Sequence, residues 1–231
     1  VFKVAPDMPT TMTELGGLEN TSGYQGEGMV IAIVDSGLEI SHPLFTQAPT
    51  TPALAKNDLE NVLASKNLKA EEKKSGITAS QVYKTAKVPF AFDYADNDLD
   101  VAPNGAGDHG THVAGIVAGN MPEGTEEKFK MDTMGIAPEA QLLIMNVSDR
   151  QGSIYFDAVL AAVEDCIILG VDCANLSLGS PCGPAYVEGM SEVFDAAYEA
   201  GISVAVSAGN SYFSGWNSLW GDNMVKSTSV D

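Results

Sequence analysis

The chain carries several short, continuous runs of apolar and β-branched residues, most of which end at a polar or small residue. Such runs are typical of strands that are buried on both faces of a parallel sheet. The pattern predicts core strands at Met29–Val34, Ala140–Val147, Val171–Leu178 and Ile202–Val206, and a shorter alternating strand within Val88–Tyr94.

Between these runs, apolar residues recur at the spacing of helices. We expect a helix of small residues over Thr111–Asn120 and amphipathic helices over Ile154–Leu169 and from Pro184 to Gly201. Gly170 and Gly201 stand where helix C-termini are expected. Alternating strands and helices imply βαβ units with parallel strands and right-handed crossovers, so the predicted fold class is α/β.

Two segments depart from this alternation. From about Gln47 to Lys87 the composition becomes rich in Pro and Thr and then in Lys and Glu, with a partial apolar stripe. We expect residues 47–87 to be a surface insertion with one or two helices within a single domain that covers residues 1–231. Pro9–Leu15 is expected to be a short helix, and the tail Ser211–Asp231 predicts no clear element.

The length, charge and hydrophobicity of the chain favour a protein with one core and argue against a nucleic-acid-binding or membrane-spanning protein. With 231 residues, 45% of them hydrophobic, the chain can bury one sizeable core. Its net charge is −19, and its 12 Lys and Arg residues do not cluster, which argues against a nucleic-acid partner. No apolar run is long enough for a membrane span.

The first residues and the cysteines add two further expectations. The chain begins at Val1 without the pattern of a signal peptide, so we expect a protein from which targeting segments were removed, or a piece of a longer one. Cys166, Cys173 and Cys182 make an odd number, and we interpret them as small buried or half-buried residues rather than metal ligands or a disulfide framework.

Three polar side chains follow or adjoin predicted strand and helix ends. Asp35 follows the first core strand, His109 begins the small-residue helix, and Asn210 follows the last strand. In a parallel sheet, catalytic groups collect at the carboxyl ends of strands. An acid, an imidazole and an amide in that order suit acyl transfer, because the acid orients the imidazole that takes a proton from a nucleophile. Taken singly, Asp35 could be a turn former and His109 an ordinary helix start.

The segments Asp35-Ser36-Gly37, His109-Gly110-Thr111-His112-Val113-Ala114-Gly115 and Ala208-Gly209-Asn210 together resemble the subtilisin-like serine proteases, the subtilases, over about Gly26 to Asn210. The resemblance implies a three-layer α/β/α fold around a mainly parallel sheet, here incomplete at the C-terminus. It also implies that Asp35 and His109 are catalytic and that Asn210 donates its amide to the oxyanion. His112 matches a residue that the family does not use for proton transfer, and we expect it to pack inside the molecule.

The same resemblance assigns residues that bind a protein or peptide substrate. The pocket for the residue before the scissile bond would have Ser177, Leu178 and Gly179 as one wall and Ser207, Ala208 and Gly209 as the other. An edge that pairs with extended substrate would be formed by Gln151, Gly152 and Ser153. Main-chain bonds to such edges hold a peptide, and the pockets give selectivity.

Two departures from the family pattern carry further expectations. The interval from Asp35 to His109 is longer than in minimal subtilisins and resembles the lactocepin-type cell-envelope proteinases, which implies a multidomain extracellular or cell-surface protein. No Gly-Thr-Ser segment for the nucleophile occurs in the chain. We therefore expect a fragment that needs the missing C-terminal part of its own domain as a partner and is inactive alone.

The acidic loop Asp96–Asp100 offers oxygen ligands at alternate positions but lacks the Gly and the Glu of an EF-hand. We expect a solvated turn, keep calcium as a hypothesis because subtilases often bind it, and expect no required cofactor. The rival hypothesis is a subtilase-like pseudoprotease that binds or signals. A nucleotide-binding domain is set aside because no Gly-x-Gly-x-x-Gly or phosphate loop is present.

Overall fold

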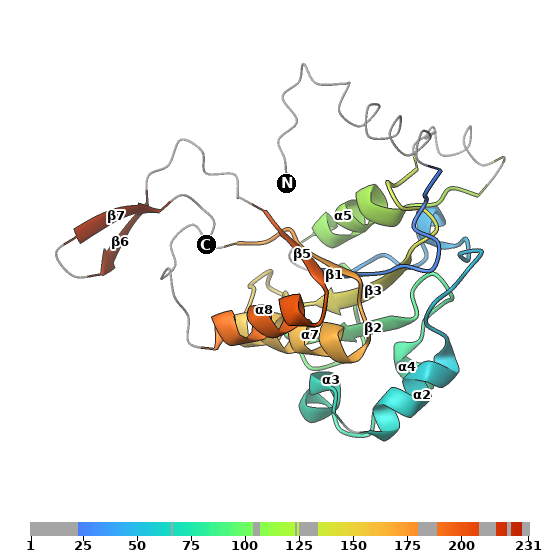
Figure 1. Cartoon of the computed structure of the whole chain (residues 1–231), viewed down its shortest axis with the longest axis horizontal. Helices are drawn as coiled ribbons and strands as arrows, with labels where there is room; N and C mark the ends of the chain where they lie inside the picture. The colour runs from blue at the N-terminus through green and yellow to red at the C-terminus, as the bar shows by residue number, and fades with distance from the viewer. Residues whose placement is uncertain are drawn as a thin grey trace, which may run out of the picture.

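In the computed structural model, the described residues are 23–65, 67–103, 107–122, 124, 134–179, 189–207, 216–220 and 223–227. At the centre lies a five-stranded, all-parallel sheet with the strand order β2-β3-β1-β4-β5 (Figure 1). Its strands are β1 (Val30–Asp35), β2 (Phe90–Asp93), β3 (Gln141–Asn146), β4 (Cys173–Leu176) and β5 (Ser203–Val206). The five predicted strands are thus confirmed, with ends shifted by a few residues.

Helices cover both faces of the sheet, because both faces of its strands are apolar. Residues of β1 alternate between two clusters: Ile33 packs with α5 (His109–Ala118), whereas Ala32 and Val34 face the side of α7 (Phe156–Ile168). Helix α8 (Met190–Glu199) lies beside α7 on that second face (Figure 1). The expected three-layer α/β/α architecture is confirmed.

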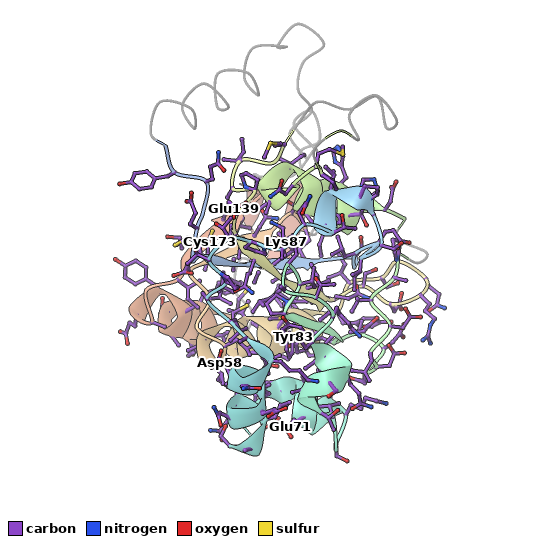
Figure 2. All side chains as sticks on the ribbon, turned by 90° about the vertical axis from the view of Figure 1, so that its right-hand side faces the viewer. Asp58, Glu71, Tyr83, Lys87, Glu139 and Cys173 are labelled. Carbon is purple, nitrogen blue, oxygen red and sulfur yellow. The ribbon has the colours of Figure 1, made fainter. Side chains whose placement is uncertain are left out.

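The segment 47–87 contains three short helices, α2 (Lys56–Ala64), α3 (Lys69–Lys73) and α4 (Ala79–Val82), where one or two were expected. A 3-10 turn, η1 (Pro43–Phe45), precedes them. Leu59, Leu68 and Val82 are fully buried and belong to the cluster that α7 and β2 share. The helices that carry Asp58 and Glu71 lie at the end of the molecule opposite α5 (Figure 2).

A buried carboxylate attaches the segment 47–87 to the three-layer core of the protein. Asp165 of α7 is 0% exposed and accepts hydrogen bonds from the first two amides of α3, those of Lys69 (2.6 Å) and Ala70 (3.0 Å). The hydroxyl of Tyr94, which follows β2, donates to the same carboxylate over 2.7 Å. Burial raises the pKa of the Asp165 carboxyl to about 6. One side chain therefore joins α3, α7 and the end of β2.

The tail differs from expectation. Strands β6 (Trp216–Trp220) and β7 (Asn223–Ser227) pair as an antiparallel hairpin, so the expectation of no clear element is wrong. The sequence holds the missed pattern, since two residues of turn-forming type, Gly221 and Asp222, separate two runs that contain Trp, Leu, Met and Val. The expected helix over Pro9–Leu15 and the expected helix start at Pro184 lie outside the described residues.

Among the described cysteines, Cys166 is buried and Cys173 is half-buried, as expected, and both are free thiols. Burial raises the pKa of both thiols, which keeps them protonated and unreactive. Cys182 lies outside the described residues. Within the part of the chain that is described, no helix has the length and apolar character needed to cross a membrane.

Candidate active site

The last residue of β1 and the first residue of α5 form an acid–imidazole pair. Asp35 is 3% exposed, and its Oδ1 lies 2.7 Å from Nδ1 of His109. A carboxylate only accepts hydrogen bonds, so this contact requires the proton on Nδ1 and leaves Nε2 as the acceptor. The His109 side chain is 32% exposed, which lets Nε2 meet a reacting group.

Neighbouring donors fix the orientation of the Asp35 carboxylate. Oδ1 also accepts the amide of Ser36 over 2.7 Å and the Ser36 hydroxyl over 3.2 Å. The Ser36 hydroxyl oxygen in turn accepts the amide of Gly110 over 3.1 Å. Within the described residues, the other oxygen, Oδ2, is buried and accepts no hydrogen bond. The carboxylate is thus held through the oxygen that faces the imidazole.

Two glycines let the pair approach so closely. A Cβ atom at Gly110 would lie 2.3 Å from the carbonyl oxygen of Gly37 and 3.2 Å from Oδ1 of Asp35. Gly37 has a φ of +93°, and a Cβ there would lie 2.4 Å from the carbonyl oxygen of Val101. Glycine is therefore required at both positions for steric reasons, so that the catalytic Asp and His of the two motifs can come together.

The second imidazole of the motif lies elsewhere. His112 is exposed, whereas Gly110, Val113 and Ala114 are the buried residues in the same two turns of α5. The expectation that His112 packs inside the molecule is therefore wrong. At helical spacing, His112 lies on the side of α5 opposite these buried residues.

The expected substrate edge, Gln151–Ser153, forms a turn after β3. The carboxylate of Asp149 closes this turn: its Oδ1 accepts the amides of Gln151 (2.9 Å) and Ser153 (2.8 Å). Its Oδ2 accepts the hydroxyl of Tyr155 over 2.9 Å. Gln151 and Ser153 are exposed, and Gly152 has a φ of +85°. The turn is rigidly bonded and open to a ligand.

Of the two expected pocket walls, residues 177–179 and Ser207 are described, and they lie where β4 and β5 end. The amide of Ser207 donates to the carbonyl of Leu176 over 3.1 Å, and its hydroxyl donates to the carbonyl of Leu178 over 3.2 Å. The segment Ser177–Gly179 thus lies beside Ser207. Ala208, Gly209 and Asn210 lie outside the described residues, so the oxyanion role of Asn210 stays a prediction, as do the substrate roles.

Sequence reasoning missed a second polar pair at the same edge of the sheet. Asp93 and Asn146 end the adjacent strands β2 and β3, and Nδ2 of Asn146 donates to Oδ2 of Asp93 over 2.5 Å. Asp93 is 2% exposed, and burial raises the pKa of its carboxyl to about 6. The sequence signal for this pair was that Asp93 and Asn146 are polar residues at the ends of apolar runs.

The positively charged side chain of Arg150 pairs with the acidic loop. Arg150 Nη2 lies 2.7 Å from Oδ2 of Asp98, and Arg150 Nε lies 3.9 Å from Oδ2 of Asp96. The side chains of Asp96 and Asp98 are 22% and 26% exposed, so the turn is only partly solvated. No group of His, Cys, Asp or Glu among the described residues is arranged to hold a metal ion. Calcium stays a hypothesis.

Comparisons with known proteins found a matching family model and several curated relatives. The model of the Subtilase family matches residues 26–229. The PI-type proteinase of Lactococcus lactis subsp. cremoris is 35% identical over 197 residues, which are 83% of this chain and 10% of that protein. The C5a peptidase of Streptococcus pyogenes is 32% identical over 192 residues, which are 80% of this chain and 15% of that protein. The chain thus spans only a small part of these relatives.

Proposed function

Because the chain belongs to the subtilase family, we propose that it supplies the acid and the base of a serine endopeptidase. His109 is the general base and Asp35 is the carboxylate that orients it. The 2.7 Å contact between Nδ1 of His109 and Oδ1 of Asp35 is the observation that carries the proposal. It fixes the tautomer in which Nε2 is free to take a proton.

The proposed reaction has two halves. Nε2 of His109 takes the proton of a serine hydroxyl as the serine oxygen attacks the peptide carbonyl carbon, and Asp35 stabilises the imidazolium that forms. The side-chain amide of Asn210 donates to the oxyanion. His109 then gives the proton to the leaving amine, and the C–N bond breaks. Water, activated by His109, hydrolyses the acyl-enzyme and regenerates the serine.

We propose that the serine lies in the remaining part of the same peptidase domain. No Gly-Thr-Ser segment occurs in the 231 residues. The exposed strand β5 supports this proposal, because Val206 at its end is 50% exposed and no described strand pairs with its outer edge. A further strand would satisfy that edge. The 231-residue chain alone is expected to be inactive.

We propose further that the parent protein acts on proteins or peptides, outside the cell or at its surface. The exposed turn Gln151–Ser153 supports binding of an extended peptide, because such a turn can offer main-chain groups to a substrate strand. The location follows from the resemblance to cell-envelope proteinases. Residues 151–153 would form the edge, and residues 177–179 and 207–209 would form the pocket.

The test is made in the full-length protein with two histidine variants from the same helix. His109→Ala should lower peptide cleavage by about 10⁶-fold, the order of loss when the general base of a triad is removed, and should abolish labelling by a serine-directed phosphonate. His112→Ala is the matched control, because it removes a histidine from the same helix and leaves the bond between His109 and Asp35 in place. It should keep both activities.

Unimpaired labelling of His109→Ala would contradict the assignment. If the wild-type full-length protein gains no phosphonate mass and cleaves no peptide, the alternative of a pseudoprotease that binds or signals takes its place.

A further inference from the structure

Two loops leave the same edge of the sheet side by side. The acidic loop (Asp96–Asp100) comes shortly after the end of β2, and the edge loop (residues 147–155) follows β3 and contains the proposed substrate edge. Their roots are paired, because Asp93 and Asn146 are register partners in adjacent parallel strands. Both side chains are almost fully buried, and the Asn146 amide donates to the Asp93 carboxylate. The two loops therefore share a buried hydrogen bond where they begin.

Each partner of this buried bond also shapes its own loop. Oδ1 of Asp93 accepts the amides of Ala95 (2.9 Å) and Asp96 (2.8 Å), which starts the acidic loop. Two backbone bonds between Asp93 and Asp98, each 3.1 Å, close it. Oδ1 of Asn146 accepts the amide of Ser148 over 3.1 Å, at the start of the edge loop. The conformations of the two loops are thus set together.

Arg150 joins the loops a second time, near their tips. Its guanidinium lies 2.7 Å from Asp98, and its own backbone amide donates to Oδ2 of Asp96 over 3.2 Å. Arg150 immediately precedes Gln151 in the chain. The side chain is 59% exposed, so the ion pair contributes little to overall stability. Its effect is on the geometry of the neighbouring residues.

We propose that Asp93, Asn146 and Arg150 are positioning residues that hold the edge loop in the shape that an extended substrate requires. The acidic loop is then part of the substrate-binding apparatus, because these three residues act through the shape of the edge loop. The proposal rests on the proposed function, because it takes residues 151–153 as the segment that pairs with a peptide. A loop that is already ordered binds a peptide strand without the entropy cost of ordering.

The experiment compares two substrates in the full-length protein. One is a peptide long enough to reach the edge loop, and the other is a single-residue ester that occupies only the pocket beside the serine. Arg150→Gln should raise KM for the long peptide about two- to fivefold, with kcat unchanged, and should leave the ester's kinetics unchanged. Asp93→Asn should act in the same direction, and Arg150→Lys should rescue only part of the loss, because Lys lacks the planar fork.

The matched control is Glu72→Gln, which removes another exposed ion pair, with Lys69 (3.1 Å), on helix α3. It should change neither substrate's kinetics. Because Arg150 is exposed, its variant tests the idea even if Asp93→Asn folds poorly. Equal effects of Arg150→Gln on the long peptide and the ester, or none on either, would overturn the proposal while His109→Ala still abolishes activity. A wild-type protein that cleaves neither substrate and takes no phosphonate would instead remove the proposed function and this inference with it.

Discussion

At the scale of single residues, Gly110 sets the distance between helix α5 and the end of β1. Alanine at this position would place Cβ 2.3 Å from a backbone oxygen of Gly37, so α5 must move. His109 would move with it and lose its contact with Asp35. We expect Gly110→Ala to lower kcat/KM by about 10²-fold, the effect of a misplacement near 1 Å, and to destabilise the protein by about 1–3 kcal/mol.

The same helix contains the control. At Gly115 a Cβ atom would lie 3.5 Å from a methyl carbon of Leu44, an ordinary contact. Gly115→Ala should keep activity and raise the free energy of unfolding by up to about 1 kcal/mol, since Ala favours helix. Peptide kinetics and urea denaturation of both variants check this pair. Full activity in Gly110→Ala would show that the glycine is not needed for the catalytic geometry.

The residues of the site differed in how far the sequence could predict them. Asp35 and His109 stand in a long motif whose chemistry is specific, and the structure brings them together. Asp93 and Asn146 escaped prediction because their meeting depends on the register between β2 and β3, which a sequence does not show. The expected burial of His112 failed because that position lies on the side of α5 opposite its buried residues.

At the scale of elements, the attachment of α3 depends on Asp165. Three donors converge on this buried carboxylate, two of them from the α3 N-terminus. Asp165→Ala would leave them without their acceptor, which should cost about 3 kcal/mol of unfolding free energy in urea denaturation. Amide hydrogen exchange over residues 69–73 should accelerate more than exchange in β1.

Asp157 provides the comparison for that prediction. It lies on the same helix, α7, and pairs with Lys73 over 3.3 Å, but its side chain is 76% exposed. Asp157→Ala should cost less than about 0.5 kcal/mol. Equal costs for the two alanine variants would mean that the buried network does not anchor the segment.

Periodicity predicted the long elements better than the short ones. The strands of the sheet and helix α7 were identified because their apolar runs are continuous or repeat over several turns. The segment 47–87 yielded too few helices, since its apolar residues, such as Leu59 and Val82, are spread over three short helices. The hairpin of β6 and β7 was missed because its strands mix polar residues with Trp and Leu.

At the scale of the whole molecule, buried ionisable groups set how stability changes with pH. Burial raises the pKa values of Asp93 and Asp165 from 3.8 to about 6. Between pH 3.8 and about 6, these two carboxyls therefore stay protonated in the folded state but are ionised in the unfolded state. The free energy of unfolding should therefore fall as the pH rises from about 4 to about 6. Each carboxyl could contribute up to about 3 kcal/mol.

At alkaline pH, the free energy of unfolding should change with pH in the opposite direction. Lys87 is 1% exposed, and its ammonium donates to the carbonyls of Pro138 (2.6 Å) and Ala140 (2.7 Å). Burial lowers its pKa to about 8 from 10.5, so between these values the unfolded state binds more protons and stability rises with pH. Urea denaturation at several pH values should show a minimum between about 6 and 8. Asp165→Asn should flatten the acid limb, and an unchanged limb would contradict the assignment.

The strand order has a consequence for how the protein is made. The chain forms β1 at the centre, and β4 and β5 then add in sequence at one side, so the outermost strand on that side is also the last of the five sheet strands to be synthesised. Domains begin to fold while the ribosome is still adding residues. If the serine is encoded downstream, a nascent chain assembles its acid and base before any nucleophile exists. Nascent enzymes on one messenger therefore cannot digest each other, whereas their open β5 edges can pair with one another until the rest of the domain arrives.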